Sequence, residues 1–527
     1  MYRKNLFPLL PWLVLLMGKE LLSQTIIPGG DVSGQWTAAS SPYLVFDDVR
    51  IPPGSTLGIG PGVRVEFQGN HDFTVEGLLL ASGMPEDSIH FTISDTAGFT
   101  DTVMAAGGWG GFRFLNRNAA DPSLLRYCVV SYGKANGRDP EKRKGGGLYA
   151  RQYTTLQVQH CRFHHNLALL DGGGIYYDES SSVTIEYCDI SYNTAFRSGG
   201  GIYNGRNCDA LVKNNPIHHN TALLMRVVPP YVSFSGRGGG FFASDDHHKS
   251  PRVINNYICN NKAVSGGGIY ESTMGIIISG NVICNNDGSG IFNGHRLGEG
   301  KYSNNTICNN LRFGGIVTNS WKLDITGNIL WNNINNSNSG VQIETDYGTP
   351  GVTYCNIQNG FPGEGNISDF PFFTGPTLGA GRNFDAMAAD WTLLDISPCT
   401  NKAGPDTSDI GLFYQDLEGN PRIFDDRIDI GAFENQALTM NTGDAGDVPV
   451  TVNVFPNPTR GRVDFAFFRL LEGNIYFLSM NGQVMLIDHI NRDKDRTFNL
   501  GGFPPGTYVW RIDDASGTIR GKIILEP

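Results

Sequence analysis

Short runs of alternating apolar and polar residues recur along most of the chain. Residues 63–67, 89–93 and 183–187 are examples, each only five residues long. An alternation with a period of two predicts β-strands, because successive side chains of a strand point to opposite faces. No window shows the sustained 3.6-residue spacing of an amphipathic helix, so the pattern predicts an all-β protein.

Two motifs divide these runs into repeats. Three glycines, or Gly-Ser-Gly in the last copy, precede an apolar residue and an aromatic one, starting at residues 145, 172, 199, 238, 266 and 288. A second motif, an apolar residue followed by two variable residues and Asn, places seven asparagines in one register: Asn166, Asn193, Asn220, Asn261, Asn286, Asn310 and Asn333. Such repeats predict the coils of a right-handed parallel β-helix.

One coil alone buries almost nothing, whereas coils stacked about 4.8 Å apart place like residues on like residues. We expect the seven asparagines to form a structural ladder, each linking its amide to those above and below. We also expect them to adopt the left-handed backbone that Asn tolerates at a corner. A β-propeller is the rival fold, but propeller repeats run to about 40–50 residues.

The ends of the chain differ from this repeat. Arg3 and Lys4 precede an apolar run that is too short for a membrane helix, which predicts a signal peptide at 1–23 and no transmembrane segment in the mature chain. The β-helix and its N-terminal cap are predicted at 24–435, a polar linker at 436–450, and a small β-sandwich at 451–527.

The coils between about residues 35 and 435 resemble the right-handed parallel β-helix family of pectate-lyase-like surface proteins. The segments Ser397-Pro-Cys399 and Arg427-Ile-Asp-Ile-Gly-Ala-Phe-Glu434 are similar to the closing part of such proteins from Bacteroidetes-type bacteria. Residues 451–527 resemble a type IX secretion sorting domain, through Val454-Phe-Pro-Asn-Pro458 and Lys522-Ile-Ile-Leu525. This resemblance implies handling by the type IX secretion machinery and display at the outer-membrane surface or outside the cell.

The aromatic residue of each glycine motif is the first candidate for binding. Alternation points it outward, so the six rings should form an exposed stripe that could stack against sugar rings. Self-stacking that shields the sheet is the favoured interpretation, and sugar binding is the alternative. The glycan-binding candidates are Tyr149, Tyr176, Tyr203, Phe242, Tyr270 and Phe292.

Asp245 and Asp246 are weak catalytic candidates in an insertion at 225–251. Paired carboxylates near His and Lys can support acid/base hydrolysis, and clustered Asp can hold Ca²⁺ in a lyase of this fold. The Gly-His-Gly and Arg-Ile-Lys motifs that accompany such pairs in the family are missing, so a solvated loop is the favoured interpretation.

Cysteine and histidine give no clear metal pattern. Six of the nine cysteines fall in two registers, which predicts a ladder of small buried residues, with a disulfide between neighbouring coils as the alternative. The pairs His164–His165 and His218–His219 would be about 10 Å apart, too far for one ion. We therefore expect no metal or cofactor, apart from Ca²⁺ under the lyase alternative.

The net charge of −11 disfavours nucleic acid as a partner, because an acidic chain repels phosphate. With acids scattered between registers, the sequence favours a surface-anchored binding or adhesin-like module for polysaccharides or cell-surface glycans over an enzyme. The alternative function is a polysaccharide lyase or glycoside hydrolase that acts on an acidic polysaccharide.

Overall fold

The computed structural model describes residues 24–223, 225–227, 232–234, 236–245, 249–335, 340, 342–345, 348–404, 414–424, 427–436, 452–479, 484–514 and 517–527. The chain forms two compact units, which divide at residues 437 and 438. The signal peptide predicted at 1–23 and residues 437–450 of the predicted linker lie outside the described residues.

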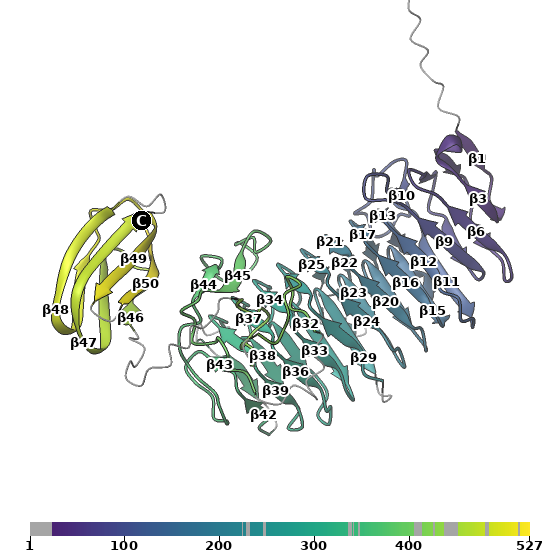
Figure 1. The fold of residues 1–527 in the computed structure, drawn as a ribbon. Helices are drawn as coiled ribbons and strands as arrows, with labels where there is room; N and C mark the ends of the chain where they lie inside the picture. Colours follow the sequence, from purple (N-terminus) through teal and green to yellow (C-terminus); the bar gives the residue numbers. More distant parts are fainter. Residues whose placement is uncertain are drawn as a thin grey trace, which may run out of the picture. The chain divides into compact units, whose positions relative to one another are not determined.

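The first unit is a right-handed parallel β-helix, whose strands stack coil by coil in Figure 1. Its described residues form three long sheets, A, B and C, of 13, 12 and 12 strands. The strands of sheet A are β1 (Thr25–Ile27), β4 (Tyr43–Val45), β7 (Arg64–Phe67), β10 (Ile89–Ile93), β13 (Cys128–Ser131), β17 (Arg162–His164), β21 (Asp189–Ser191), β25 (Pro216–His218), β31 (Tyr257–Cys259), β34 (Val282–Cys284), β37 (Thr306–Cys308), β40 (Ile329–Trp331) and β43 (Asn356–Ile357).

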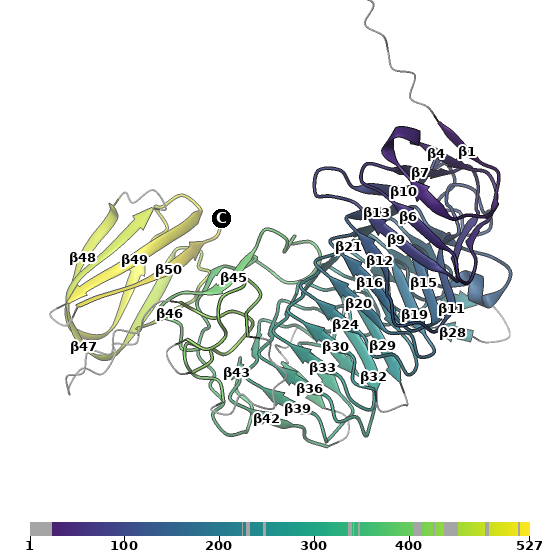
Figure 2. The ribbon, with the colours of Figure 1, turned by 45° about the vertical axis from the view of Figure 1, so that its right-hand side comes forward.

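Sheets B and C follow sheet A around each coil. Sheet B consists of β2 (Gly30–Asp31), β5 (Val49–Ile51), β8 (Asp72–Val75), β11 (Gly111–Arg117), β15 (Leu148–Tyr153), β19 (Ile175–Asp178), β23 (Ile202–Asn204), β29 (Phe241–Asp245), β32 (Ile269–Thr273), β35 (Ile291–Asn293), β38 (Ile316–Thr318) and β41 (Ile343–Thr345). Sheet C, whose strands run side by side in Figure 2, consists of β3 (Gly34–Trp36), β6 (Thr56–Ile59), β9 (Leu78–Ser82), β12 (Ser123–Arg126), β16 (Leu156–Gln159), β20 (Val183–Glu186), β24 (Leu211–Lys213), β30 (Arg252–Ile254), β33 (Ile277–Ser279), β36 (Lys301–Ser303), β39 (Asp324–Thr326) and β42 (Gly351–Thr353).

The remaining elements of this unit are short. They are the parallel strands β14 (Lys134–Ala135), β18 (Leu167–Ala168), β22 (Thr194–Ala195) and β26 (Thr221–Ala222), the antiparallel pairs β27 (Met225–Val227) with β28 (Val232–Phe234) and β44 (Phe373–Gly375) with β45 (Asp390–Leu393), and the 3₁₀ turns η1 (Ala38–Ser40) and η2 (Pro140–Arg143).

The core follows from the alternation in the sequence. Residues pair in register between coils, so that Ile190 lies beside Ile217 and Ile217 beside Ile258, all fully buried. The inward side chains therefore form columns along the axis, and each coil covers the apolar surface of its neighbour.

A ladder of asparagine amides connects these coils. The Nδ2 of Asn166 donates to Oδ1 of Asn193 at 2.9 Å, and the Nδ2 of Asn193 donates to Oδ1 of Asn220 at 3.0 Å. Asn193 also donates to the backbone oxygen of Phe163 at 2.8 Å. The same pattern continues through Asn261, Asn286, Asn310 and Asn333 and ends on Gln342.

The expectation of a left-handed backbone at these asparagines was wrong. The residue before each one has the positive φ, for example His165 at 53° and Tyr192 at 55°. A left-handed residue at the apex turns its side chain outward, and the following Asn can then point its amide into the coil. The two roles that we expected of one residue are divided between neighbours.

A second ladder, which the sequence analysis missed, lies at the corner between sheets C and A. It runs through Asn215, Asn256, Asn281, Asn305 and Asn328. Cysteines extend it at both ends, because the backbone N–H of Cys161 donates to the sulfur of Cys188 at 3.3 Å, and that of Asn328 to Cys355 at 3.3 Å. All nine cysteines are buried. The sulfurs of Cys161, Cys188 and Cys355 serve as acceptors in place of the Asn amide.

The chain then folds back over sheet A as a return segment, residues 371–404, 414–424 and 427–436. Corner asparagines hold its backbone, since the Nδ2 of Asn260 donates to the carbonyl of Phe384 at 2.9 Å and its Oδ1 accepts the N–H of Ala386 at 2.9 Å. Apolar side chains of the return segment, including Trp391 and Ile430, pack on Cys259 and its neighbours. The second cysteine register therefore lies beneath a covering segment.

Buried carboxylates fasten the end of the return segment. Asp416 accepts the backbone N–H groups of Glu418, at 2.9 Å, and of Glu434, at 3.0 Å, and Glu434 accepts that of Asp429 at 3.1 Å. Burial, with Asp429 nearby, raises the pKa of Glu434 to about 8, and burial raises the pKa of Asp429 to about 6. The fully buried Arg422 lies close to all three carboxylates.

The second unit is an antiparallel β-domain. Its strands are β46 (Val452–Phe455), β47 (Arg462–Ser479), β48 (Val484–Asn499), β49 (Gly506–Asp514) and β50 (Gly517–Leu525). The long β47 pairs with β48 along most of its length, with β46 through its first half and with β49 through its second half. The strands enclose an aromatic core that includes Phe465, Phe477 and Trp510.

Asn193→Ala should lower the free energy of unfolding by about 2–4 kcal/mol, because it leaves several buried backbone groups without partners, each costing about 1–3 kcal/mol. Urea unfolding followed by circular dichroism measures this change. Thr184→Ala, on the outer face of β20, is the matched control and should change stability by no more than about 0.5 kcal/mol. If both substitutions lowered the free energy of unfolding equally, the ladder would not contribute specifically to stability.

Glu434 should make the β-helix unit less stable as the pH rises from about 5 to 8. A carboxyl whose folded pKa is raised from 4.5 to about 8 keeps its proton longer in the folded state, so deprotonation favours unfolding. Glu434→Gln keeps an acceptor but cannot ionise, and it should flatten this part of the pH profile. Parallel profiles for wild type and variant in thermal melts would refute the assignment.

Candidate functional site

The six predicted aromatic side chains stand in one row on the outer side of sheet B. Neighbouring rings stack with centroids 4.7–5.3 Å apart, and their planes differ by no more than 18°. The row is Tyr149, Tyr176, Tyr203, Phe242, Tyr270 and Phe292. Register between coils therefore brings together residues that are far apart in the chain.

This row is mostly buried and stacked on itself, and it is not an exposed stripe. Tyr149 and Tyr176 are only 2% exposed. The rings cover one another's faces, and cations cover part of the rest: the guanidinium of Arg113 lies 5.2 Å from the ring centroid of Tyr149, and Lys144 Nζ lies 5.3 Å from that of Tyr176. Most ring faces thus have partners within the protein, which leaves little open platform for a sugar.

The two weak catalytic candidates cannot be placed. Asp245 is the last residue of β29, but its side chain is outside the described part of the structure, as is all of Asp246.

Open aromatic surface occurs instead at the two corners that flank sheet A. One corner stacks Tyr127, His160 and Tyr187, and the other stacks Tyr132, His165, Tyr192 and His219. These are the left-handed residues that precede the ladders, and their outward direction leaves Tyr187 53% and Tyr192 45% exposed.

A polar cluster lies on sheet A between these corners. The carboxylate of Asp189 contacts a basic side chain on each side. Its Oδ2 is 3.2 Å from Nε of Arg162, and its Oδ1 is 3.2 Å from Nε2 of His218. These contacts hold the pKa of Asp189 below its ordinary value despite burial. The cluster joins side chains from β17, β21 and β25.

Near the N-terminal end, Asp47, Asp48 and His71 place three ligand atoms within 4.8 Å of one another. Oδ1 of Asp48 already accepts the backbone N–H of Asp72 at 2.8 Å, and both aspartates are exposed. The group contains ligand types that suit a cation, and its internal contacts account for its arrangement without one.

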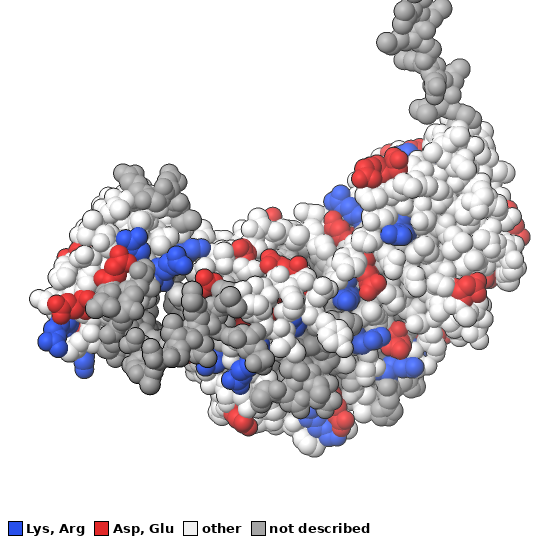
Figure 3. Space-filling view, in the orientation of Figure 1, with Lys and Arg blue, Asp and Glu red and all other residues white. Residues whose placement is uncertain are grey.

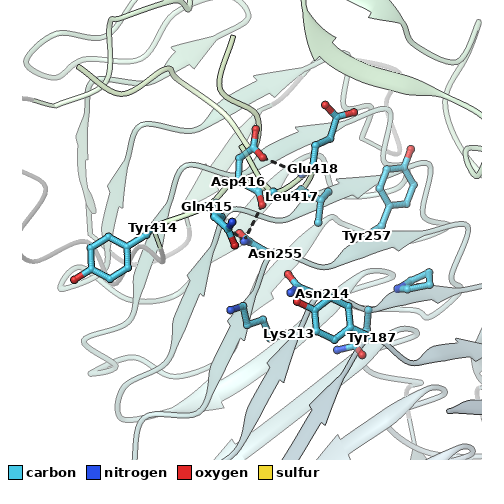
Figure 4. Close-up of a pocket in the computed structure, with 13 residues that line it drawn as sticks. Tyr187, Lys213, Asn214, Asn255, Tyr257, Tyr414, Gln415, Asp416, Leu417 and Glu418 are labelled. Carbon is cyan, nitrogen blue, oxygen red and sulfur yellow. Dashed lines mark hydrogen bonds between the residues drawn. The ribbon is translucent and has the colours of Figure 1, made fainter. Parts of the chain in front are cut away.

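A pocket of about 460 Å³ lies where the first aromatic corner meets the return segment. Tyr187, Lys213, Asn214 and Tyr257 line the side formed by the coils, and residues 414–419 line the other side (Figure 4). The Nδ2 of Asn255 donates to the carbonyl oxygen of Gln415 at 3.0 Å, which fastens the return segment to the coil beside the pocket.

The register explains why a ring faces this space. Tyr187 has an aromatic neighbour, His160, on one side at 5.0 Å between centroids. In the next coil the corner residue is Asn214, a smaller side chain. The stack of rings therefore ends at Tyr187, beside the pocket.

Two acids of the return segment lie at the pocket, and their roles differ. The carboxylate of Asp416 is occupied by backbone N–H groups of the return segment itself. Burial, together with the nearby carboxylates of Asp416 and Asp390, raises the pKa of Glu418. Figure 4 shows the carboxylate of Glu418 at the side of the pocket opposite Tyr187.

Charges on the β-helix unit are dispersed. On the face shown in Figure 3, Lys and Arg side chains alternate with Asp and Glu and form no continuous patch of one sign. Ion pairs between coils of this unit include Arg151 with Glu179 and Lys322 with Glu299. The described residues on this face therefore form no extended cationic track for a polyanion.

Comparisons with known proteins agree with both units. The family described as "Right handed beta helix region" matches residues 89–273, and the family described as "Secretion system C-terminal sorting domain" matches residues 453–526. The chain is a β-helix protein with a type IX sorting domain. It fits the Bacteroidetes-type surface proteins that its sequence resembles, and the sorting domain directs it to the cell surface or the extracellular space.

One short stretch of this β-helix protein is similar to an animal protein. Over 65 residues it is 37% identical to Protein bark beetle of Drosophila melanogaster, which is 12% of this chain and 2% of that protein. The chain thus spans about 2% of the length of that relative. Within its described residues, the β-helix protein has no helix long and apolar enough to span a bilayer.

The pocket residues were not predicted, although part of the signal is present in the sequence. Tyr187 precedes Cys188 in the corner register, so its outward position could have been inferred from the repeat. Residues 414–419 belong to no repeat, and their position depends on how the return segment packs on sheet A.

Tyr176→Ala should destabilise the β-helix unit by about 3–5 kcal/mol, the usual loss when a large buried aromatic side chain is removed. Tyr176→Phe keeps the stacked ring and loses only the hydrogen bond to Asp178, at 2.8 Å, so its loss should be about 1–3 kcal/mol. Chemical denaturation compares the two. An alanine variant as stable as wild type would show that the aromatic row has no structural role.

Proposed function

We propose that the protein is an exported surface module that binds glycans, and that the pocket beside Tyr187 receives a sugar unit. The pocket itself carries this proposal. Its volume of about 460 Å³ lies in the range of about 300–1,000 Å³ that is usual for small-ligand sites.

The lining chemistry suits a saccharide. A sugar ring has an apolar face of C–H groups and a rim of hydroxyls, so it needs an aromatic surface and mixed donors and acceptors. Tyr187 provides the aromatic surface, and the side-chain amide of Asn214 both donates and accepts. Lys213 adds a positive charge that favours acidic sugars.

The localisation of the protein also supports glycan binding. A sorting domain that sends the chain to the cell surface presents its long β-helix to external polymers. A ladder residue follows each corner residue of the pocket, Cys188 after Tyr187 and Asn215 after Asn214, so the binding residues are held in place before the ligand arrives. This arrangement is typical of an adhesin-like module.

The second candidate function is a polysaccharide lyase or glycoside hydrolase, favoured by the raised pKa of Glu418. A carboxyl with a raised pKa is shifted in the direction that a general acid needs. Asp416, the other acid in the pocket lining, has its carboxylate bound to backbone N–H groups, so no second acid is available in that lining to act as base or nucleophile. Binding is therefore the preferred function.

Tyr187→Asn should weaken glycan binding by the mature protein at least tenfold, because it removes the only aromatic face that the first corner presents to the pocket. Asn occupies the same left-handed register at 214 and 255, so the fold should tolerate it. A glycan array followed by calorimetry on the bound glycan measures the change. Tyr127→Asn, in the same corner but away from the pocket, should bind like wild type, and a loss in both variants would argue against this site.

Incubation of the protein with the glycan that it binds tests whether the protein binds or cleaves it. Incubation with wild-type protein should yield no new reducing ends and no unsaturated products. Turnover that is lost in Glu418→Gln would favour the enzyme.

A further inference from the structure

The two histidine pairs on sheet A have the same unusual geometry. His164 and His218 end β17 and β25, and His165 and His219 are the left-handed corner residues that follow. In each pair the two Nδ1 atoms are 2.9 Å apart, and the ring planes meet at 90° and 86°. In the neutral state the two Nδ1 atoms of each pair lie at hydrogen-bond distance, and the tautomer decides which of them donates.

The surroundings favour the lone pair on His218 Nδ1. Its other nitrogen, Nε2, is 3.2 Å from the carboxylate Oδ1 of Asp189, and a carboxylate favours the N–H on the nitrogen that faces it. In a neutral ring, Nδ1 then carries no proton. A carboxylate behind the distal nitrogen of a histidine is the usual outer contact of a metal-binding imidazole.

The distance between the two Nδ1 atoms determines the nitrogen–metal–nitrogen angle at an ion bound to both. With metal–nitrogen bonds of about 2.0–2.1 Å, nitrogens 2.9 Å apart subtend about 90° at the ion. A tetrahedral ion such as Zn²⁺ would need a separation of about 3.3 Å with the same bonds. Right angles belong to the tetragonal coordination of Cu²⁺ and Ni²⁺, and of these Cu²⁺ binds nitrogen ligands more tightly.

We propose that each histidine pair chelates one Cu²⁺ ion through its two Nδ1 atoms, with water completing the coordination. The chain then holds two separate copper sites. Tyr192 divides them, since its ring stacks on His165 at 5.3 Å and on His219 at 4.9 Å between centroids. The distance of about 10 Å that excludes a shared ion is the distance expected between two independent ones.

Burial favours the neutral form of three of the four imidazoles. Burial lowers the pKa of His164 to about 4, and it also lowers the pKa values of His165 and His219. Arg162 faces the first pair, whereas Arg382 and Asp385 of the return segment face the second. Burial of His164, His165 and His219 thus favours the neutral imidazole that a metal ligand requires.

Each site has only two protein ligands. Among the described residues, three His, Cys, Asp or Glu ligand atoms come within 4.8 Å of one another only at Asp47, Asp48 and His71. The affinity should therefore be that of a bidentate chelate, and it should depend on the right-angle geometry. His165 is exposed, which leaves the first site open to solvent.

Calorimetric titration of the full mature chain with CuCl₂ should give two equivalents of bound copper, and Zn²⁺ should bind at least about tenfold more weakly. His165→Asn and His219→Asn should each remove one equivalent, and the double variant both. Asn occupies the same left-handed register at Asn260 and Asn285, so these variants keep the local backbone. Electron paramagnetic resonance should show two nitrogen ligands per Cu²⁺ in wild type.

His160→Asn is the matched control, because it removes a left-handed corner histidine that has no histidine beside it in the chain. It should retain two equivalents. Asp189→Asn should weaken the His218–His219 site by about 10–100-fold, as loss of the outer carboxylate usually does. Two equivalents retained in the double variant, or no stoichiometric binding in wild type, would overturn the proposal and leave the 2.9 Å contacts as simple hydrogen bonds.

Discussion

From Asn166 to Asn333, a buried amide in each coil donates to the amide of the next, and this contact sets the register of these coils. The ladder nitrogen of Asn193 also binds the carbonyl of Phe163, so one side chain fixes both the turn and the coil below it. Two such ladders bound sheet A on its two sides. With register fixed at both corners, every outer side chain of the sheet has a defined neighbour about 4.8 Å away.

The same constraint explains how cysteines can replace asparagines. At the corner between sheets C and A, the acceptor needs only to be small, buried and aimed at the next backbone N–H. The sulfur of Cys188 meets this need for Cys161, and that of Cys355 meets it for Asn328. An exported protein can thus carry nine buried thiols without a disulfide, because several of them already have a structural partner.

Binding surface arises where the periodic and the irregular parts of the chain meet. The coils alone give stacked rings whose faces are covered, as in the row from Tyr149 to Phe292. The pocket needs the end of a stack, at Tyr187, and a second wall that only the return segment provides. Each histidine pair also lies where a regular element ends. One histidine is the last residue of a strand, and the other is the outward-pointing corner residue that follows it.

The sequence by itself determined the fold class, the residues of the first ladder and the secretion domain. Alternating strands with Asn at one fixed place in every repeat are compatible with few folds. It did not determine which residue of the corner is left-handed, since Asn is compatible with both roles and only the direction of the amide separates them. It also left open whether the aromatic row is exposed, because Arg113 and Lys144 reach the rings from other coils. The pocket and the 2.9 Å approach of the histidine nitrogens were decided by the tertiary structure alone, since they depend on packing and side-chain rotation, which no periodicity in the chain encodes.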